Sequence, residues 1–178
     1  MPLEGIQSFK ELYAKYNSLV YNTALNFTKN EVDAEEVTQE VFIKIHLNLK
    51  KFKGNSTLKT WIYRITINAS LQHIKKNKVT FLHIDGDRKL ETPDFNHPGV
   101  ILEKKEDAII LYKTLEILPD SQKTAFILSY IEGLPRQNVA DIMETTLKSV
   151  ESLLQRAKHK MRKHLINSYP ERRNFKKK

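Results

Sequence analysis

The stretch from Phe52 to Lys78 combines the side chains that bind unpaired nucleic-acid bases. It reads FKGNSTLKTWIYRITINASLQHIKKNK and contains six cations and no acid. Aromatic rings stack on unpaired bases, each stack contributing roughly 1–3 kcal/mol, and cations attract the phosphates. The polar turn Lys53–Ser56 offers backbone and side-chain hydrogen bonds to a base that has been extracted from its duplex. The stretch therefore predicts a turn, at the head of a basic helix, that holds an extruded base.

Trp61 has two interpretations that the sequence leaves open. Its neighbour one helical turn on, Ile65, is apolar, as a residue of a core-facing stripe would be. In that case Trp61 holds the turn in place and does not touch nucleic acid. In the other case its ring is available to a base.

A second group of polar side chains, near the C-terminus, suits duplex DNA. The apolar residues from Leu147 to Leu165 recur at three- and four-residue steps, which predicts an amphipathic helix. Its opposite face carries groups that hydrogen-bond to base edges in a major groove. A solvated bundle helix is the alternative. The candidates for base edges are Lys148, Ser149, Glu151, Ser152, Gln155, Arg156 and His159, followed by Lys158, Lys160, Arg162 and Lys163 for phosphates.

A third group is acidic and lies in DAEEVTQEVFIKIH, residues 33–46. Because an acidic surface repels DNA, a protein partner is its natural use. The alternative is an ordinary amphipathic helix with acids favourably placed at its N-terminus. The polar face comprises Asp33, Glu35, Glu36, Gln39 and Glu40.

Several functional classes find no support in the sequence. There is no cysteine, which excludes disulfides and thiolate chemistry and fits a reducing cytoplasm. No apolar run is long enough for a transmembrane helix, and the N-terminus lacks a signal-peptide pattern. No phosphate loop, zinc-protease or nucleophile-elbow motif occurs. The six histidines lack metal-ligand spacing and are expected at the surface. No catalytic residue, cofactor or metal site is predicted.

The charge and the helical periodicity divide the chain into two parts. Residues 44–80 carry nine cations and no acid, and residues 148–178 carry eleven cations and two acids, which suggests two contacts with one polyanion. Between them, residues 81–107 are acidic, contain proline and glycine, and lack sustained periodicity. We expect an all-α protein with helical domains at 1–80 and 108–170, a flexible linker at 81–107 and a basic tail at 171–178.

The expected helices have identifiable ends. In the first domain they begin after Ser8, at Asp33 and after one of Asn55, Ser56 or Thr57, and the third has the stripe Leu58, Trp61, Ile65, Ala69 and Gln72. In the second domain a helix from Ile110 to Leu118 precedes one from Gln122 to Glu132 that Asp120 or Ser121 caps. A short helix from Pro135 to Met143 and the long one from Leu147 then form a helix-turn-helix. Glu144 stands at the position of the turn where the backbone is expected to be left-handed. Glycine would adopt this conformation more easily, and a residue with a side chain costs about 1–2 kcal/mol there.

These motifs together resemble an extracytoplasmic-function sigma factor, a small two-domain member of the sigma-70 family. DAEEVTQEVFIKIH is similar to the family's core-polymerase-binding segment, and FKGNSTLKTWIYRITINA to its promoter-melting segment. LPDSQKTAFILSYIEGLPRQNVADIM, followed by TTLKSVESLLQRAKHKMRKHL, resembles its C-terminal helix-turn-helix. The resemblance covers about residues 6–168.

The resemblance implies a role for each group of residues in transcription initiation. Asp33, Glu36, Gln39 and Glu40 would bind core RNA polymerase, at the clamp helices of its largest subunit. Lys53, Gly54, Asn55 and Ser56 would hold a flipped base of the minus-ten promoter element, with Lys59, Trp61, Arg64 and Asn68 supporting the turn or the single strand. Lys148, Ser149, Ser152, Gln155 and Arg156 would read the minus-thirty-five element of promoter DNA. An anti-sigma factor is a further expected partner, and the linker would thread near the RNA exit path.

The sequence departs from the family pattern in the helix-turn-helix. The family often has glycine at the place of Glu144 and an apolar residue at that of Thr145, and basic residues at those of Glu151 and Leu153. These departures concern the turn and the base contacts. A free-standing helix-turn-helix regulator is the second hypothesis, and a nucleic-acid enzyme is a weaker third.

Overall fold

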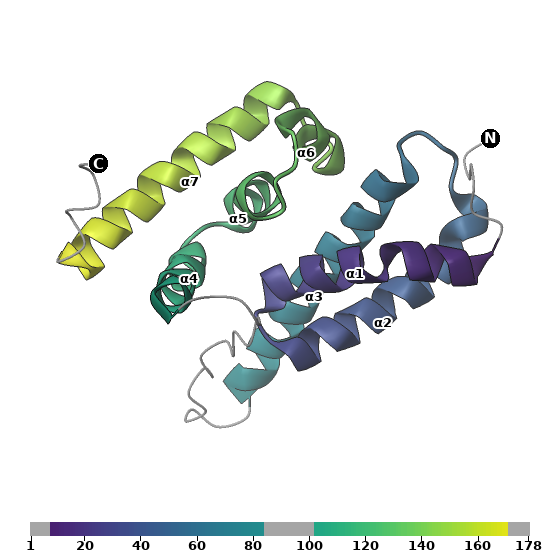
Figure 1. The fold of residues 1–178 in the computed structure, drawn as a ribbon, viewed down its shortest axis with the longest axis horizontal. Coiled ribbons are helices and arrows are strands. Elements are labelled where there is room, and N and C mark those ends of the chain that lie inside the picture. Colours follow the sequence, from purple (N-terminus) through teal and green to yellow (C-terminus); the bar gives the residue numbers. More distant parts are fainter. Residues whose placement is uncertain (1–7, 84–101, 171–178) are drawn as a thin grey trace. The chain divides into compact units, whose positions relative to one another are not determined.

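The computed structural model describes residues 8–83 and 102–170, and over these ranges the chain is helical (Figure 1). No strand occurs in the described ranges. The helices belong to two compact units, with α1 to α3 in the first and α4, α5, most of α6 and α7 in the second. The predicted all-α fold of two helical units is confirmed. The expected tail and most of the expected linker, residues 84–101, lie outside the described residues.

The first unit is a bundle of three helices that all contact one another. They are α1 (Phe9–Thr28), α2 (Glu31–Asn48) and α3 (Leu58–His83), with a short 3₁₀ helix, Leu49–Lys51, after α2. Each helix contributes one apolar stripe to a shared core, so its opposite side faces out. The largest fully buried side chains of this core are Leu12, Val20, Phe27, Val37, Val41, Ile45 and Ile62.

Side-chain caps fix where the helices of the first unit begin. Ser8 caps α1 as predicted, its Oγ accepting from the backbone N–H of Glu11 at 3.3 Å. The expected cap of α2 was wrong. Asn30 has extended backbone and its Oδ1 accepts from the N–H of Asp33 at 2.9 Å, which leaves Asp33 inside the first turn. Of the three candidates for α3, Thr57 is the cap, accepting from the N–H of Thr60 at 3.1 Å.

The buried stripe of α3 differs from the predicted one. Trp61, Ile65 and Gln72 were expected in the core, but the first two are half-buried and Gln72 is exposed. Polar residues take core positions because their hydroxyls bond within the helix. The Thr66 Oγ1 donates to the carbonyl of Ile62 at 2.9 Å, and the Ser70 Oγ to that of Thr66 at 2.8 Å. The buried residues are Leu58, Ile62, Tyr63, Thr66, Ile67, Ala69, Ser70 and His73.

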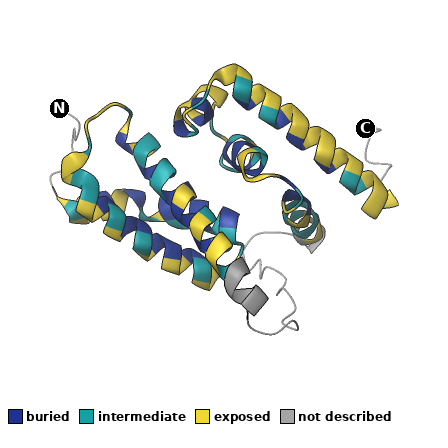
Figure 2. Cartoon of the chain, turned by 180° about the vertical axis from the view of Figure 1, so that it is seen from behind, coloured by how far each residue is buried: buried dark blue, intermediate teal, exposed yellow. Residues whose placement is uncertain are grey.

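The second unit packs three shorter helices and a long one. Its elements are α4 (Leu102–Leu115), α5 (Asp120–Phe126), the π-helical segment η2 (Ile127–Ile131), α6 (Arg136–Ile142) and α7 (Leu147–Ser168). Both α4 and α5 contact α7. The buried residues of α7 are Val150, Leu154, Ala157 and Met161, and Figure 2 shows exposed residues along the rest of it. The predicted long amphipathic helix is confirmed.

Three helix ends in the second unit differ from expectation. α4 begins at Leu102, so six residues of the expected linker are helical, as are the three residues of α3 beyond residue 80. α5 follows Pro119 directly and has no side-chain cap, because Asp120 is already helical. The expected single helix to Glu132 becomes π-helical at Ile127.

The turn between α6 and α7 holds Glu144 in the left-handed conformation, with φ of 53°. The side chain is exposed. Gly133, which ends η2, has φ of 68°, where glycine carries no steric penalty. The strain predicted for Glu144 is therefore present.

We predict that Glu144→Gly raises the free energy of unfolding of the second unit by about 1 kcal/mol, because it removes left-handed strain. Urea unfolding followed by far-UV circular dichroism measures the change. Trp61 is the only tryptophan and lies on α3, so its fluorescence follows the unfolding of the first unit separately. Glu151→Gly, within α7, is the matched control and lowers stability by a similar amount. If both variants lower stability, the turn is not strained.

Candidate functional site

The turn between the 3₁₀ helix and α3 exposes a short polar loop. Lys53, Gly54 and Asn55 are exposed, and Ser56 is half-buried. Gly54 has φ of 72°, a conformation that glycine adopts without cost. The Thr57 cap fixes the loop at its helical end. The loop thus presents polar groups from a fixed point on the bundle.

Aromatic packing holds the other end of the loop. The rings of Phe52 and Trp61 lie 5.2 Å apart between centroids, and both pack against the core of the first unit. This packing is what the supporting interpretation of Trp61 requires, and the role itself stays a prediction. It is only half-buried, and the rest of its side chain lines a groove.

The groove lies between α2 and α3 and has a volume of about 460 Å³. It brings together two lysines, three side-chain amides and an apolar floor, a combination that suits a nucleotide. Of the predicted residues, Trp61 and Asn68 line it, whereas the loop residues, Lys59 and Arg64 do not. The lining residues are Lys44, Asn48, Lys51, Trp61, Ile65, Asn68 and Gln72.

Sequence reasoning missed five of these residues. On α3 the lining residues recur at steps of four, three and four, which is one helical face, but that face was assigned to the core. On α2, Lys44 and Asn48 are one turn apart, and only the packing of α2 on α3 brings them to the groove. Lys44 also forms an ion pair with Glu40, with 2.6 Å between Nζ and Oε1.

Most of the polar residues predicted on α2 lie on the side opposite its buried stripe, and Asp33 lies at the edge of that side, where it contacts His73 of α3. Glu36 and Gln39 are exposed, and the side chains of Asp33 and Glu40 are 35% and 44% exposed. Large apolar side chains that the sequence reading did not select lie along the same helix: Val32, Ile43 and Leu47 are 72%, 60% and 67% exposed. Acidic and apolar groups side by side suit a protein partner.

A depression of about 360 Å³ lies on the exposed side of α7. It contains four of the five residues predicted for duplex DNA, and Gln155 is exposed but outside it. The Thr146 Oγ1 caps α7 by accepting from the N–H of Ser149 at 3.1 Å, which sets the angle at which the helix starts. The lining residues are Thr146, Lys148, Ser149, Ser152, Leu153 and Arg156.

Lys158 lies on another side of α7 from this depression. Its Nζ is 4.6 Å from the centroid of the Tyr130 ring. The Lys158 ammonium lowers the pKa of the Tyr130 phenol, with a smaller contribution from Arg136. This lysine thus contributes positive charge to the flank of the helix-turn-helix.

Comparison with known proteins agrees with this geometry. The sequence matches Sigma-70 region 2 over residues 12–80 and Sigma-70 region 4 over residues 108–161. The chain belongs to the sigma-70 family, as an extracytoplasmic-function sigma factor. The predicted resemblance is confirmed, and with it the function, promoter-specific transcription initiation.

Relatives of this sigma factor span nearly its whole length. It is 29% identical over 169 residues to the RNA polymerase sigma-H factor of Pseudomonas aeruginosa, covering 89% of this chain and 86% of the relative. It is 26% identical over 166 residues to the sigma factor SigW of Bacillus subtilis, covering 89% of each. The sigma-E factor of Escherichia coli K12 is 27% identical over 161 residues, covering 85% of this chain and 83% of the relative.

Two solved structures share the fold of this sigma factor. One is the sigma factor RpoE of Bartonella quintana in complex with the anti-sigma factor NepR, with 20% identity, a TM-score of 0.68 and 90% and 98% of the two chains covered. The other is CnrH in complex with the cytosolic domain of CnrY, with 20% identity, a TM-score of 0.64 and 93% and 92% covered. In the described part of the sigma factor, no helix has the length and apolar character that crossing a membrane requires.

Proposed function

We propose that this sigma factor divides promoter recognition between its two units. Residues 1–80 act as region 2 and hold the opened minus-ten element, and residues 108–170 act as region 4 and read the duplex of the minus-thirty-five element. Residues 81–107 link them, and the tail 171–178 adds phosphate attraction. The observation that carries the proposal is the loop Lys53–Ser56, whose first three residues are exposed. The loop is anchored at one end by the Phe52–Trp61 packing and at the other by the Thr57 cap. Lys51 and Trp61, on either side of the loop, line the basic groove.

The loop is proposed to capture one base of the non-template strand. Extracting a base costs a few kcal/mol, and a loop that hydrogen-bonds the base offsets part of that cost. Anchoring matters because a loop that is already ordered loses little conformational entropy on binding. Lys59, Arg64 and Asn68 then support the strand, and Trp61 supports the loop from beneath.

The outward side of α2 is proposed to bind core RNA polymerase. Asp33, Glu36, Gln39 and Glu40 supply acidic and amide groups, and the exposed Ile43 and Leu47 supply the apolar area that gives an interface its affinity. The polymerase performs all the chemistry, and the sigma factor has no active site of its own.

An anti-sigma factor is proposed as a further partner, acting in the cytoplasm. Support comes from the two structural relatives, in which sigma factors of this fold are held by other proteins. The absence of cysteine fits the same compartment.

The proposal predicts that the purified chain joins core polymerase and directs initiation from specific start sites. Transcription of genomic DNA in vitro with core polymerase alone, and with the chain added, tests this. Gln39→Ala with Glu40→Ala lowers the affinity for core polymerase about tenfold, because both residues belong to the proposed interface. Glu11→Ala, exposed on α1, is the control and leaves affinity unchanged. Duplex binding without any polymerase binding favours a free-standing regulator.

For the loop, we predict that Asn55→Ala with Ser56→Ala impairs promoter opening more than closed-complex formation, because the captured base loses hydrogen bonds. Permanganate footprinting measures opening, and a pre-melted template restores it. Asn17→Ala with Ser18→Ala, the same residue pair on α1, is the matched control and opens normally. If pre-melting restores nothing, the loop does not capture a base.

For region 4, we predict that Arg156→Ala weakens binding of the holoenzyme to the upstream element about tenfold, since one good base contact contributes about 1–3 kcal/mol. The measurement compares the native upstream element with a scrambled one. Arg162→Ala, exposed on the same helix, lowers binding equally on both, as a phosphate contact does. An Arg156→Ala loss that is equal on both sequences contradicts base readout.

A further inference from the structure

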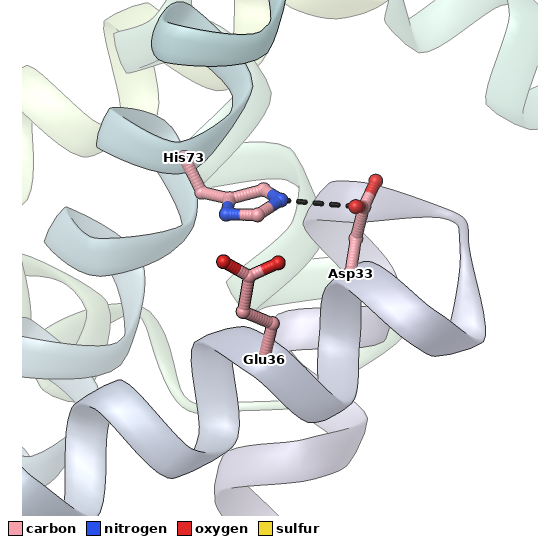
Figure 3. A group of neighbouring side chains, drawn as sticks. All are labelled: Asp33, Glu36 and His73. Atoms are coloured by element: carbon pink, nitrogen blue, oxygen red, sulfur yellow. Dashed lines mark hydrogen bonds and ion pairs between the residues drawn. The ribbon is translucent and has the colours of Figure 1, made fainter.

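A histidine and two carboxylates meet between α2 and α3 of region 2. Asp33 and Glu36 lie three residues apart at the start of α2, and His73 faces them from α3 (Figure 3). One ligand atom from each of the three lies within 4.8 Å of the others. We propose that Asp33, Glu36 and His73 form a binding site for a divalent transition-metal ion of the Zn²⁺ class.

The surroundings of His73 give the first reason. The side chain is only 8% exposed, although a surface position was expected. Its Nε2 lies 3.0 Å from the Asp33 Oδ1 and 3.0 Å from the Asn77 Nδ2. A carboxylate only accepts and an amide nitrogen only donates, whereas a ring nitrogen does one or the other. With the Asn77 amide nitrogen turned toward the ring, Nε2 can therefore serve only one of these two contacts.

A metal ion removes this conflict. It uses the lone pairs of both the imidazole and the carboxylate, so that Nε2 needs no proton and Asp33 needs no donor. Asn77 is half-buried, and its amide is then free to turn its oxygen toward the ion or to bond to water. Fixing the His73 nitrogen by metal would also join α2 to α3.

The spacing of the ligand atoms suits coordination. Two ligands that are each about 2.1 Å from a metal lie about 3.0 Å apart at right angles and about 3.4 Å apart in a tetrahedron. The Asp33 Oδ1 and His73 Nε2 are 3.0 Å apart. The Glu36 carboxylate is exposed and extends toward the imidazole ring in Figure 3, so a small side-chain rotation completes the set.

The ligand types select the class of metal. One imidazole nitrogen with two carboxylates suits Zn²⁺, Fe²⁺ or Mn²⁺ better than Mg²⁺ or Ca²⁺, which favour oxygen-only sites. The two carboxylates lie toward solvent, which gives the ion an entry path. Asp33 and Glu36 are also proposed to bind polymerase, so a bound cation would neutralise two acids of that surface; the metal titration below is made without polymerase and tests the site separately.

Calorimetric titration of the metal-free chain with Zn²⁺, without polymerase or DNA, tests the site. We expect one saturable site, with Mg²⁺ at least about tenfold weaker. Glu36→Gln lowers the Zn²⁺ affinity at least about tenfold, because it removes an anionic ligand. Glu35→Gln, also exposed on α2 and outside the cluster, leaves it unchanged.

Histidine variants provide the second measurement. His73→Gln abolishes the site, whereas His46→Gln, an exposed histidine on α2, retains it. Circular dichroism checks that each variant folds. If His73→Gln does not fold, the Glu36→Gln and Glu35→Gln pair decides. Absence of a saturable Zn²⁺ site, equal affinities in that pair, or equal affinity for Mg²⁺ overturns the proposal.

Discussion

The packing of α2 against α1 and α3 determines every surface that region 2 presents. Val37, Val41 and Ile45 are fully buried and occupy one side of α2. A helix that buries one stripe of residues exposes the opposite side. The exposed Glu36, Ile43 and Leu47 therefore lie on the outer side of α2. The same packing places Lys44 and Asn48 of α2 opposite Trp61 of α3, which creates the groove. Removing an apolar residue of this stripe would therefore disturb partner binding and strand binding together.

Polar residues in the core explain where the sequence reading succeeded and where it failed. The buried stripes of α1, α2 and α7 are mostly apolar, with Thr23 and Thr38 as the polar members, so their buried sides were predictable. In α3, Thr66 and Ser70 are buried and satisfy their hydroxyls with carbonyls four residues earlier. Such a position looks polar in a sequence and behaves as core, which moved the predicted stripe by one residue. The cap of α2, Asn30, was missed for a related reason. Several polar residues stand near the start of the helix, and only the backbone geometry shows which of them is the cap.

Candidate surfaces could be proposed from the sequence where their residues come from one segment of the chain. The loop Lys53–Ser56 and the polar side of α7 are each contiguous, and residue type and helical period sufficed. The groove and the cluster of Asp33, Glu36 and His73 are different, because their members come from two helices. Asp33 and His73 are 40 positions apart, and only the packing of α2 on α3 joins them. No spacing rule for metal ligands or nucleotide sites covers such a pair.

The energetics explain why one protein carries two nucleic-acid units. Extracting a base costs a few kcal/mol, and one base–aromatic stack returns roughly 1–3 kcal/mol. The proposed capture by the loop would therefore balance opening at best and could not drive it alone. Phosphate contacts by the nine cations of residues 44–80 add to it, but cations bind duplex and single strand without distinguishing sequence. A second unit that reads duplex DNA raises the effective concentration of the loop at one promoter. In the proposed division, region 4 would supply the promoter specificity, and region 2 would then need only a small preference for the open strand.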